Sequence, residues 1–223
     1  MNRIKTGISG MDRLIGGGFP SETIILLSGG PGTGKTLFGL KFLLEGAAKG
    51  EKCCYVSLNE KKDELLRACN MISSLGTVKK YIDKNFVIEH VQLDEHITMK
   101  KFVNIISSYP NIDRLVIDNV NKLLMFSDSG KNYRSHFSEL VNYLKKMGCS
   151  LLVCETDGEH IDTGHSEAFE CDGVVNLSFL ELEEKPMRTL DIHKMRYTPF
   201  DPKMPHEFVI NSMDVRLGTT KVI

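Results

Sequence analysis

The chain has 223 residues, of which 41% are hydrophobic and 26% are charged, and its formal net charge is −1 at pH 7. These values are typical of a soluble globular protein, and no apolar run is long enough to span a membrane. The near-zero net charge supplies no global attraction for nucleic acid.

Residues 1–22 precede the first strong strand pattern and are expected to form a lead-in segment. Ile8, Met11, Leu14 and Ile15 are spaced for one face of a short helix between glycine turns. We expect this helix to pack beside the site that follows it; a flexible tag is the alternative. The segment has no signal-peptide core, so we expect a cytoplasmic protein.

The motif at residues 29–36, GGPGTGKT, fills every fixed position of the phosphate-binding pattern G-x-x-x-x-G-K-[ST]. A β-branched apolar run at 23–28 predicts a buried strand before it, and helix formers at 37–49 predict a helix after it. Backbone N–H groups in this context wrap a polyphosphate, and side chains at the turn would block that approach.

The motif therefore predicts a site for ATP with Mg²⁺. The expected nucleotide-binding residues are Gly30, Pro31, Gly32, Thr33, Gly34, Lys35, Thr36 and Leu37. Lys35 would place its ammonium against the β- and γ-phosphates, and Thr36 would offer its hydroxyl to the metal.

Strands and helices alternate from the motif to residue 155. Strands are predicted at 53–58, 86–91, 114–118 and 150–154, and helices at 61–75, 98–109 and 133–147. This alternation predicts an α/β fold over residues 23–155, with a mostly parallel sheet and helices on both faces.

A different pattern follows residue 155. Segments 173–179, 188–194 and 207–210 are strand-like with only short turns between them, which predicts an antiparallel β extension at 156–223. No linker divides the chain, so we expect one domain over residues 1–223.

Two acidic positions are candidates for the chemistry of ATP hydrolysis. Asp118 ends the strand at 114–118, where a second carboxylate steadies the Mg²⁺ shell; capping of the next turn is the alternative. Asn59 and Glu60 follow the strand at 53–58, which in this kind of sheet can lie next to the strand that feeds the phosphate loop.

Glu60 is the candidate base that orients and deprotonates the attacking water, with Lys35 as the second catalytic residue. It also begins the charged cluster at 60–64, where acidic side chains favour the start of a helix. A purely solvated role for Glu60 therefore stays open.

Lys194 and Arg196 are spaced to share one face of a strand. Neighbouring cations are often only solvated, but a neighbouring subunit could also insert them against a γ-phosphate. The six cysteines form no C-x-x-C pair, and we expect reduced core residues, with zinc or disulfides as the alternative.

Five motifs, in order along nearly the whole chain, resemble those of KaiC-like ATPases, a branch of the RecA fold. They are TGISGMD at 6–12 with GGG at 16–18, SGGPGTGKT at 28–36, YVSLNE at 55–60, LVID at 115–118 and KMRYT at 194–198. The resemblance implies a single-domain form with a RecA-like P-loop core. It also implies ATP and Mg²⁺ bound between subunits, a ring that is commonly hexameric, and Lys194 and Arg196 acting on the neighbour's nucleotide.

Among the residues that depart from the family pattern, two bear on ATP hydrolysis and the subunit contact. Asn59 replaces the first of two adjacent glutamates, so we expect hydrolysis that is slow or depends on Glu60, and Tyr197 replaces a glycine. We therefore predict an oligomeric Mg-ATP-binding ATPase that drives or gates the interactions of an unidentified protein partner. One alternative is a non-hydrolysing, ATP-gated binding module. A DNA recombinase relative is disfavoured, because the sequence lacks a basic and aromatic groove signature.

Overall fold

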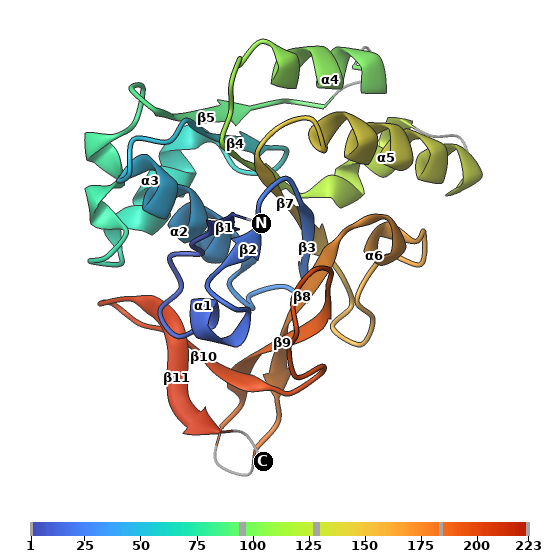
Figure 1. The fold of residues 1–223 in the computed structure, drawn as a ribbon. Coiled ribbons are helices and arrows are strands. Elements are labelled where there is room, and N and C mark those ends of the chain that lie inside the picture. The colour runs from blue at the N-terminus through green and yellow to red at the C-terminus, as the bar shows by residue number, and fades with distance from the viewer. Residues whose placement is uncertain (1, 94–96, 127–129, 183–184, 222–223) are drawn as a thin grey trace.

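The computed structural model describes residues 2–93, 97–126, 130–182 and 185–221, which form a large sheet covered by helices (Figure 1). The strands of this sheet are β3 (Ile24–Gly29), β4 (Cys53–Ser57), β5 (Phe86–His90), β6 (Arg114–Asp118), β7 (Cys149–Glu155), β8 (Gly173–Leu180), β9 (Met187–Met195), β10 (His206–Ile210) and β11 (Val215–Lys221). Their order across the sheet is β11-β10-β9-β8-β3-β7-β6-β4-β5. The fold is a RecA-like α/β core, as predicted.

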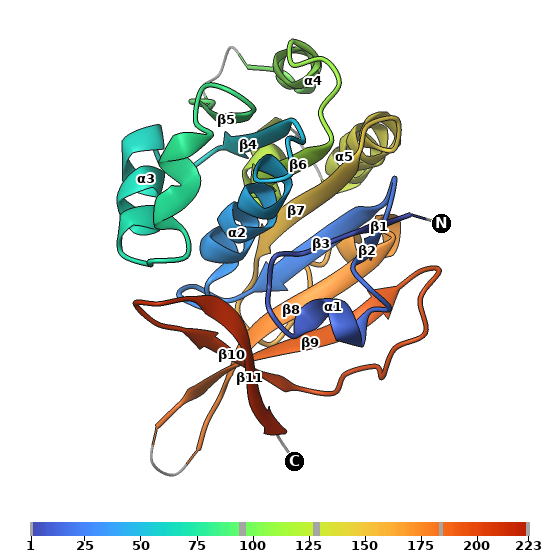
Figure 2. The same ribbon diagram turned by 60° about the vertical axis from the view of Figure 1, so that its left-hand side comes forward.

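The helices lie on both faces of this sheet (Figure 2). They are α1 (Met11–Leu14), α2 (Lys35–Ala47), α3 (Lys62–Asn70), α4 (Met99–Ser107), α5 (Gly130–Leu144) and α6 (Glu167–Glu170), with 3₁₀ turns η1 (Gly76–Lys80) and η2 (Val120–Phe126). The four long helices predicted from periodicity are present, with ends shifted by a few residues. None of the helices in the described ranges is long and apolar enough to cross a membrane.

Alternation along the strands builds two hydrophobic cores. In β3, Ile25 and Leu27 join the core under α2 and α3, whereas Ile24 and Leu26 join the core under α4 and α5. Successive strand residues point to opposite faces, so a strand that is apolar throughout must be covered on both sides. All six cysteines are buried and free, which confirms that they are core residues.

The late strands correct part of the prediction. β8 pairs in parallel with β3, from Ile25 opposite Gly173 to Gly29 opposite Leu177, so an antiparallel extension was wrong for this strand. Residues 156–172, which include α6, return the chain to the edge where β3 begins. β9 and β10 are antiparallel as predicted, and β11 adds an antiparallel edge strand that the sequence analysis missed.

The position of β4 differs from the arrangement that the sequence analysis considered. β4 does not lie beside β3, because β7 and β6 lie between them. Hydrophobic patterns identify a buried strand without giving its neighbours, because each of these strands is apolar on both faces. The residues that follow β4 nevertheless reach the phosphate loop.

The lead-in segment forms the small sheet of β1 (Arg3–Ile4) and β2 (Phe19–Pro20) around α1. Its predicted apolar face is confirmed: Ile8, Met11 and Ile15 are buried. The segment does not pack beside the nucleotide site as expected. It crosses the last turns of α2, where a Cβ on Gly7 would lie 2.8 Å from the Cβ of Glu45.

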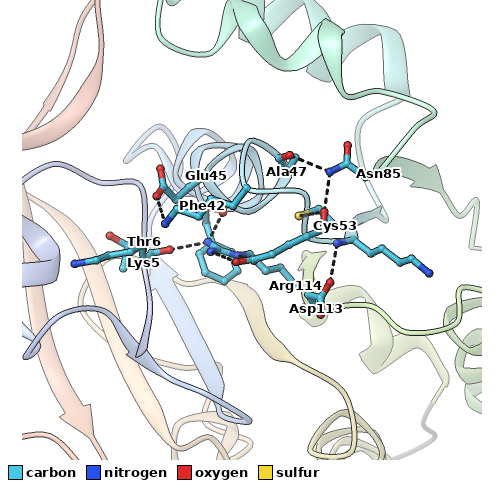
Figure 3. A network of polar contacts seen from close by, with 12 residues as sticks. Lys5, Thr6, Phe42, Glu45, Ala47, Cys53, Asn85, Asp113 and Arg114 are labelled. Atoms are coloured by element: carbon cyan, nitrogen blue, oxygen red, sulfur yellow. Dashed lines mark hydrogen bonds and ion pairs between the residues drawn. The ribbon is translucent and has the colours of Figure 1, made fainter. Parts of the chain in front are cut away.

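A buried arginine fixes this arrangement (Figure 3). The Arg114 guanidinium is buried, donates to the carbonyls of Lys5 at 2.6 Å and Phe42 at 2.9 Å, and pairs with the Glu51 carboxylate. Asn85 donates to the Ala47 carbonyl at 2.9 Å. Cationic and amide donors at this position satisfy carbonyls near the C-terminal end of α2, so the helix is held at the end far from the loop at residues 29–36.

Candidate functional site

The phosphate loop lies at the carboxyl edge of the sheet, between β3 and α2. Gly29 has φ +147°, and a Cβ there would lie 2.1 Å from the Leu177 carbonyl oxygen, so β8 leaves room only for glycine. Gly32 has φ +74°, but a Cβ at Gly32 would meet no protein atom within 4 Å. The loop is thus closed against the sheet and open on its outer side, where a phosphate has room to approach the amides.

Lys35 begins α2 and turns back over the loop. Its Nζ donates to the carbonyl oxygens of Gly29 at 2.8 Å and Gly30 at 2.7 Å. Burial lowers the Lys35 pKa, while the negative charges of Glu155 and Asp118 act against that shift. An ammonium held by two loop carbonyls here is placed to exchange them for a phosphate.

Thr36 and Asp118 meet as the metal prediction requires. The Thr36 hydroxyl donates to Asp118 Oδ2 at 2.8 Å, which joins the start of α2 to the end of β6. The Tyr55 hydroxyl donates to the same oxygen at 2.5 Å. Burial raises the pKa of Asp118, and the hydrogen bonds from Tyr55 and Thr36 oppose that rise.

A cavity of about 390 Å³ opens over these groups. It is lined by Pro31, Gly32, Gly34, Lys35, Thr36, Leu37, Asn59, Glu60, Asp118, Asn119, Glu155, Arg188 and Ile210. The cavity therefore brings together most of the predicted loop residues with Asp118 and Glu60, which are far apart in the sequence. Gly30 and Thr33, which were also predicted to bind the nucleotide, are buried and do not line it.

Glu60 reaches the cavity from the turn after β4. The Ser57 hydroxyl donates to the Glu60 carbonyl at 2.6 Å and accepts from the Glu60 amide at 3.0 Å, which fixes the turn. Burial raises the pKa of the half-buried Glu60, and Asp118 and then Glu64 add to the rise. A carboxylate with a raised pKa is a better proton acceptor than an exposed glutamate.

Two charged residues of the cavity, Glu155 and Arg188, were missed as site residues, as were Asn119 and Ile210. Glu155 ends β7 directly opposite Gly29, and its Oε2 accepts from Asn119 Nδ2 at 3.1 Å. Arg188 lies near the start of β9, where its Nε donates to the Gly32 carbonyl at 3.2 Å and its guanidinium covers the Phe179 ring at 5.2 Å. Glu155 could have been predicted, because it ends a buried strand at the carboxyl edge of the sheet. Arg188 could not, because its position at that edge depends on the strand order.

Lys194 and Arg196 lie away from this cavity, at the amino edge of the sheet. Met195 pairs with Gly173, which in turn pairs with Ile25 near the start of β3. Lys194 Nζ donates to carbonyls of the turn before β8, including Phe169 at 2.9 Å, and Arg196 Nη1 lies 3.1 Å from Asp172 Oδ1. Neither cation can contact the phosphate loop of its own chain in this arrangement.

The cavity fits a Mg-nucleotide. Gly32 leaves open space over the loop amides, Lys35 supplies a cation for phosphate, and Thr36 with Asp118 supplies the oxygen ligands that Mg²⁺ prefers. The site also lies between the carboxyl ends of the neighbouring strands β3 and β7. The connection after β3 runs through α2 on one face of the sheet, and the connection after β7 runs through α6 on the other face. Ligands of open α/β sheets bind at such a crossing point.

Comparisons with known proteins agree with this geometry. A family model described as "ATPase: KaiC" matches residues 4–221. UPF0273 protein PF1931 of Pyrococcus furiosus is 30% identical, with 100% of this chain and 96% of that protein covered. Circadian clock protein KaiC3 of Synechocystis sp. is 28% identical, covering 97% of this chain and 43% of that protein. The crystal structure of KaiC-like protein PH0186 from Pyrococcus horikoshii OT3 superposes with a TM-score of 0.82 at 29% identity, covering 97% of this chain and 99% of that one.

Proposed function

The chain belongs to the KaiC ATPase family, and from that premise we propose that it binds Mg-ATP in the cavity over residues 29–37 and hydrolyses it slowly as a homo-oligomer. The observation that carries the proposal is the 2.8 Å contact between Thr36 and Asp118 beside the Lys35 ammonium. Two elements, α2 and β6, meet there beside the loop that follows β3. We further propose that residues 1–223 act as one ATPase domain in the cytoplasm.

Each group has a defined task in this proposal. The loop amides and Lys35 hold the phosphates, and Thr36 and Asp118 hold the metal. Mg²⁺, when bound, neutralises charge that develops on the transferred phosphoryl group. Glu60 orients the attacking water and accepts its proton, and the raised Glu60 pKa supports this task.

Slow turnover follows from Asn59. Its side chain lines the cavity, but an amide does not accept a proton as a carboxylate does. Only Glu60 of that adjacent pair remains acidic. The same observation favours a second candidate function, in which the protein retains ATP to keep a shape that binds a protein partner and rarely hydrolyses it.

The location of Lys194 and Arg196 supports assembly with other copies. Both lie at the edge opposite the chain's own cavity, so action on a nucleotide requires a neighbouring chain. Tyr197, which follows Arg196, has φ +60° and so keeps a backbone conformation that suits the family's glycine. We propose a ring, with a hexamer as the expected size.

Steady-state hydrolysis and solution mass, each measured with and without ATP and Mg²⁺, test the proposal. We expect slow turnover that Glu60→Gln removes, whereas Asp63→Asn, a neutralised neighbour in the same charged cluster, retains it. Negligible wild-type turnover with tight ATP retention would favour the binding module. Absence of ATP binding would overturn both functions.

Mixing experiments test the shared site. Lys35→Ala and Arg196→Ala chains are each expected to be inactive alone. In a mixed oligomer, a phosphate loop from one chain meets Arg196 from the other, so part of the turnover should return. Failure to recover activity in mixed oligomers of confirmed composition would contradict action across a subunit interface.

A further inference from the structure

We propose that Tyr55 is a positioning residue for the metal site, holding the Asp118 carboxylate in the orientation that Mg²⁺ requires. This inference rests on the proposed Mg-nucleotide site. The Tyr55 hydroxyl donates to Asp118 Oδ2 at 2.5 Å from inside the protein, and the Thr36 hydroxyl donates to the same oxygen at 2.8 Å. Neither bond uses Oδ1.

The two donors fix the carboxylate from different elements. Tyr55 lies on β4 and Thr36 on α2, while Asp118 ends β6, which pairs directly with β4. Two hydrogen bonds to one oxygen define the rotation of the carboxylate group. Oδ1 is thereby left for the metal or for a water that the metal holds, and Asp118 lines the phosphate cavity.

The Tyr55 ring packs closely against α2. Tyr55 is fully buried, and a Cβ on Gly39 of α2 would lie 3.4 Å from Tyr55 Cε2 and 3.1 Å from Val116 Cγ1. Glycine is unfavourable inside a helix, so its presence at this contact is explained by the space that the ring and Val116 occupy. The helix that carries Thr36 thus rests on the ring whose hydroxyl holds Asp118.

If Tyr55 only filled space in the core, a phenylalanine would serve better. A phenylalanine fills the same volume and brings no polar atom into the core, whereas the Tyr55 hydroxyl needs a buried partner. That partner is a carboxylate of the proposed metal site, which also accepts from Thr36. Hydrogen-bond partners behind a metal ligand orient it, and their removal typically weakens metal binding about 10- to 100-fold.

The test is Tyr55→Phe, read out as metal affinity. Mn²⁺ would be titrated into ADP-saturated protein and followed by electron paramagnetic resonance, with Mg²⁺ competition. We expect the metal affinity to fall about 10- to 100-fold. ADP binding in the presence of a metal chelator should stay unchanged, because the phosphate loop is intact.

Tyr133→Phe is the matched control. The Tyr133 hydroxyl donates to the buried Glu167 carboxylate at 3.0 Å, in the core on the other face of the sheet. Loss of that bond can lower the thermal midpoint but should leave metal affinity at the wild-type value. Gly39→Ala is a second probe, since it crowds the Tyr55 ring while keeping the hydroxyl, and it should weaken metal binding by a smaller factor.

A double-mutant cycle with Asp118→Asn tests whether Tyr55 acts through Asp118. The effect of Tyr55→Phe on metal affinity should largely vanish in that background. Wild-type metal affinity in Tyr55→Phe, or an undiminished effect in the Asp118→Asn background, would overturn the inference. Absence of metal-dependent ADP binding in the wild type would instead overturn the proposed function.

Discussion

Lys35→Ala tests the proposed phosphate site by removing the Lys35 ammonium, which contacts the phosphate loop. The Lys35 Nζ donates to two loop carbonyls, Gly29 at 2.8 Å and Gly30 at 2.7 Å, within a nearly closed environment. Alanine removes the ammonium without adding bulk to the loop. The nucleotide loses its main cationic partner, and the two carbonyls lose a donor.

The expected loss of ATP affinity follows from the loss of one charge-assisted hydrogen bond to a phosphate. A hydrogen bond to a charged group contributes about 1.5–3 kcal/mol, so ATP affinity should fall roughly 10- to 100-fold. The stability of the free protein should change less than the ATP affinity. Burial lowers the Lys35 pKa, which means that the charged form of Lys35 is already penalised in the folded protein. That lowered pKa also means that ATP affinity should fall with rising pH earlier than for an exposed lysine.

Isothermal calorimetry of ATP binding with Mg²⁺, beside thermal melts of the free protein, separates the two effects. Lys41→Ala is the control, because Lys41 lies on the same helix but pairs with Asp214 at 2.6 Å. It should retain wild-type ATP affinity. Unchanged affinity in Lys35→Ala would refute the assignment of the phosphate site itself.

Asn59→Glu should raise turnover if a missing base limits hydrolysis, and an unchanged rate in a phosphate-release assay would reject that cause. The acid limb of the pH–rate profile should lie above the ordinary glutamate pKa, because burial raises the Glu60 pKa, and Glu60→Gln should remove this limb. Arg114→Ala should destabilise the fold by about 3–5 kcal/mol in chemical denaturation, since it breaks the ion pair with Glu51 and frees buried carbonyls. The six buried thiols should react slowly with a thiol reagent until the protein is unfolded; burial raises the Cys53 pKa to about 12.

The parts of the fold that could be predicted are those encoded locally. The loop motif, the glycine stops and the apolar runs each depend on a few consecutive residues, and they place β3, α2, β6 and Asp118 correctly. Strand order depends instead on where each connection crosses the sheet. The parallel direction of β8 and the two strands between β3 and β4 therefore have no local signature.

The site divides in the same way. Lys35 and Thr36 were predicted because the loop motif names them, and Asp118 because it ends a buried strand; the structure brings the three together. Tyr55 lies in an apolar strand and is indistinguishable in sequence from an ordinary core aromatic. Arg188 contacts the phosphate loop only because β9 runs antiparallel to β8, which brings the start of β9 to the carboxyl edge.

The two ends of α2 make different kinds of contact, and different residue types make them. At its N-terminal end, Lys35 and Thr36 exchange partners with a ligand, so their contacts must be replaceable. At its C-terminal end, the buried Arg114 donates to the Phe42 carbonyl, to the Lys5 carbonyl of the lead-in segment and to Glu51, and no ligand is needed to complete these contacts. A helix anchored at one end can respond at the other only by local adjustment of the loop. Nucleotide binding should therefore change the phosphate loop, the first turn of α2 and the turn of Glu60 more than the rest of α2. Hydrogen exchange of the α2 amides beyond that first turn should be nearly equal with and without ATP.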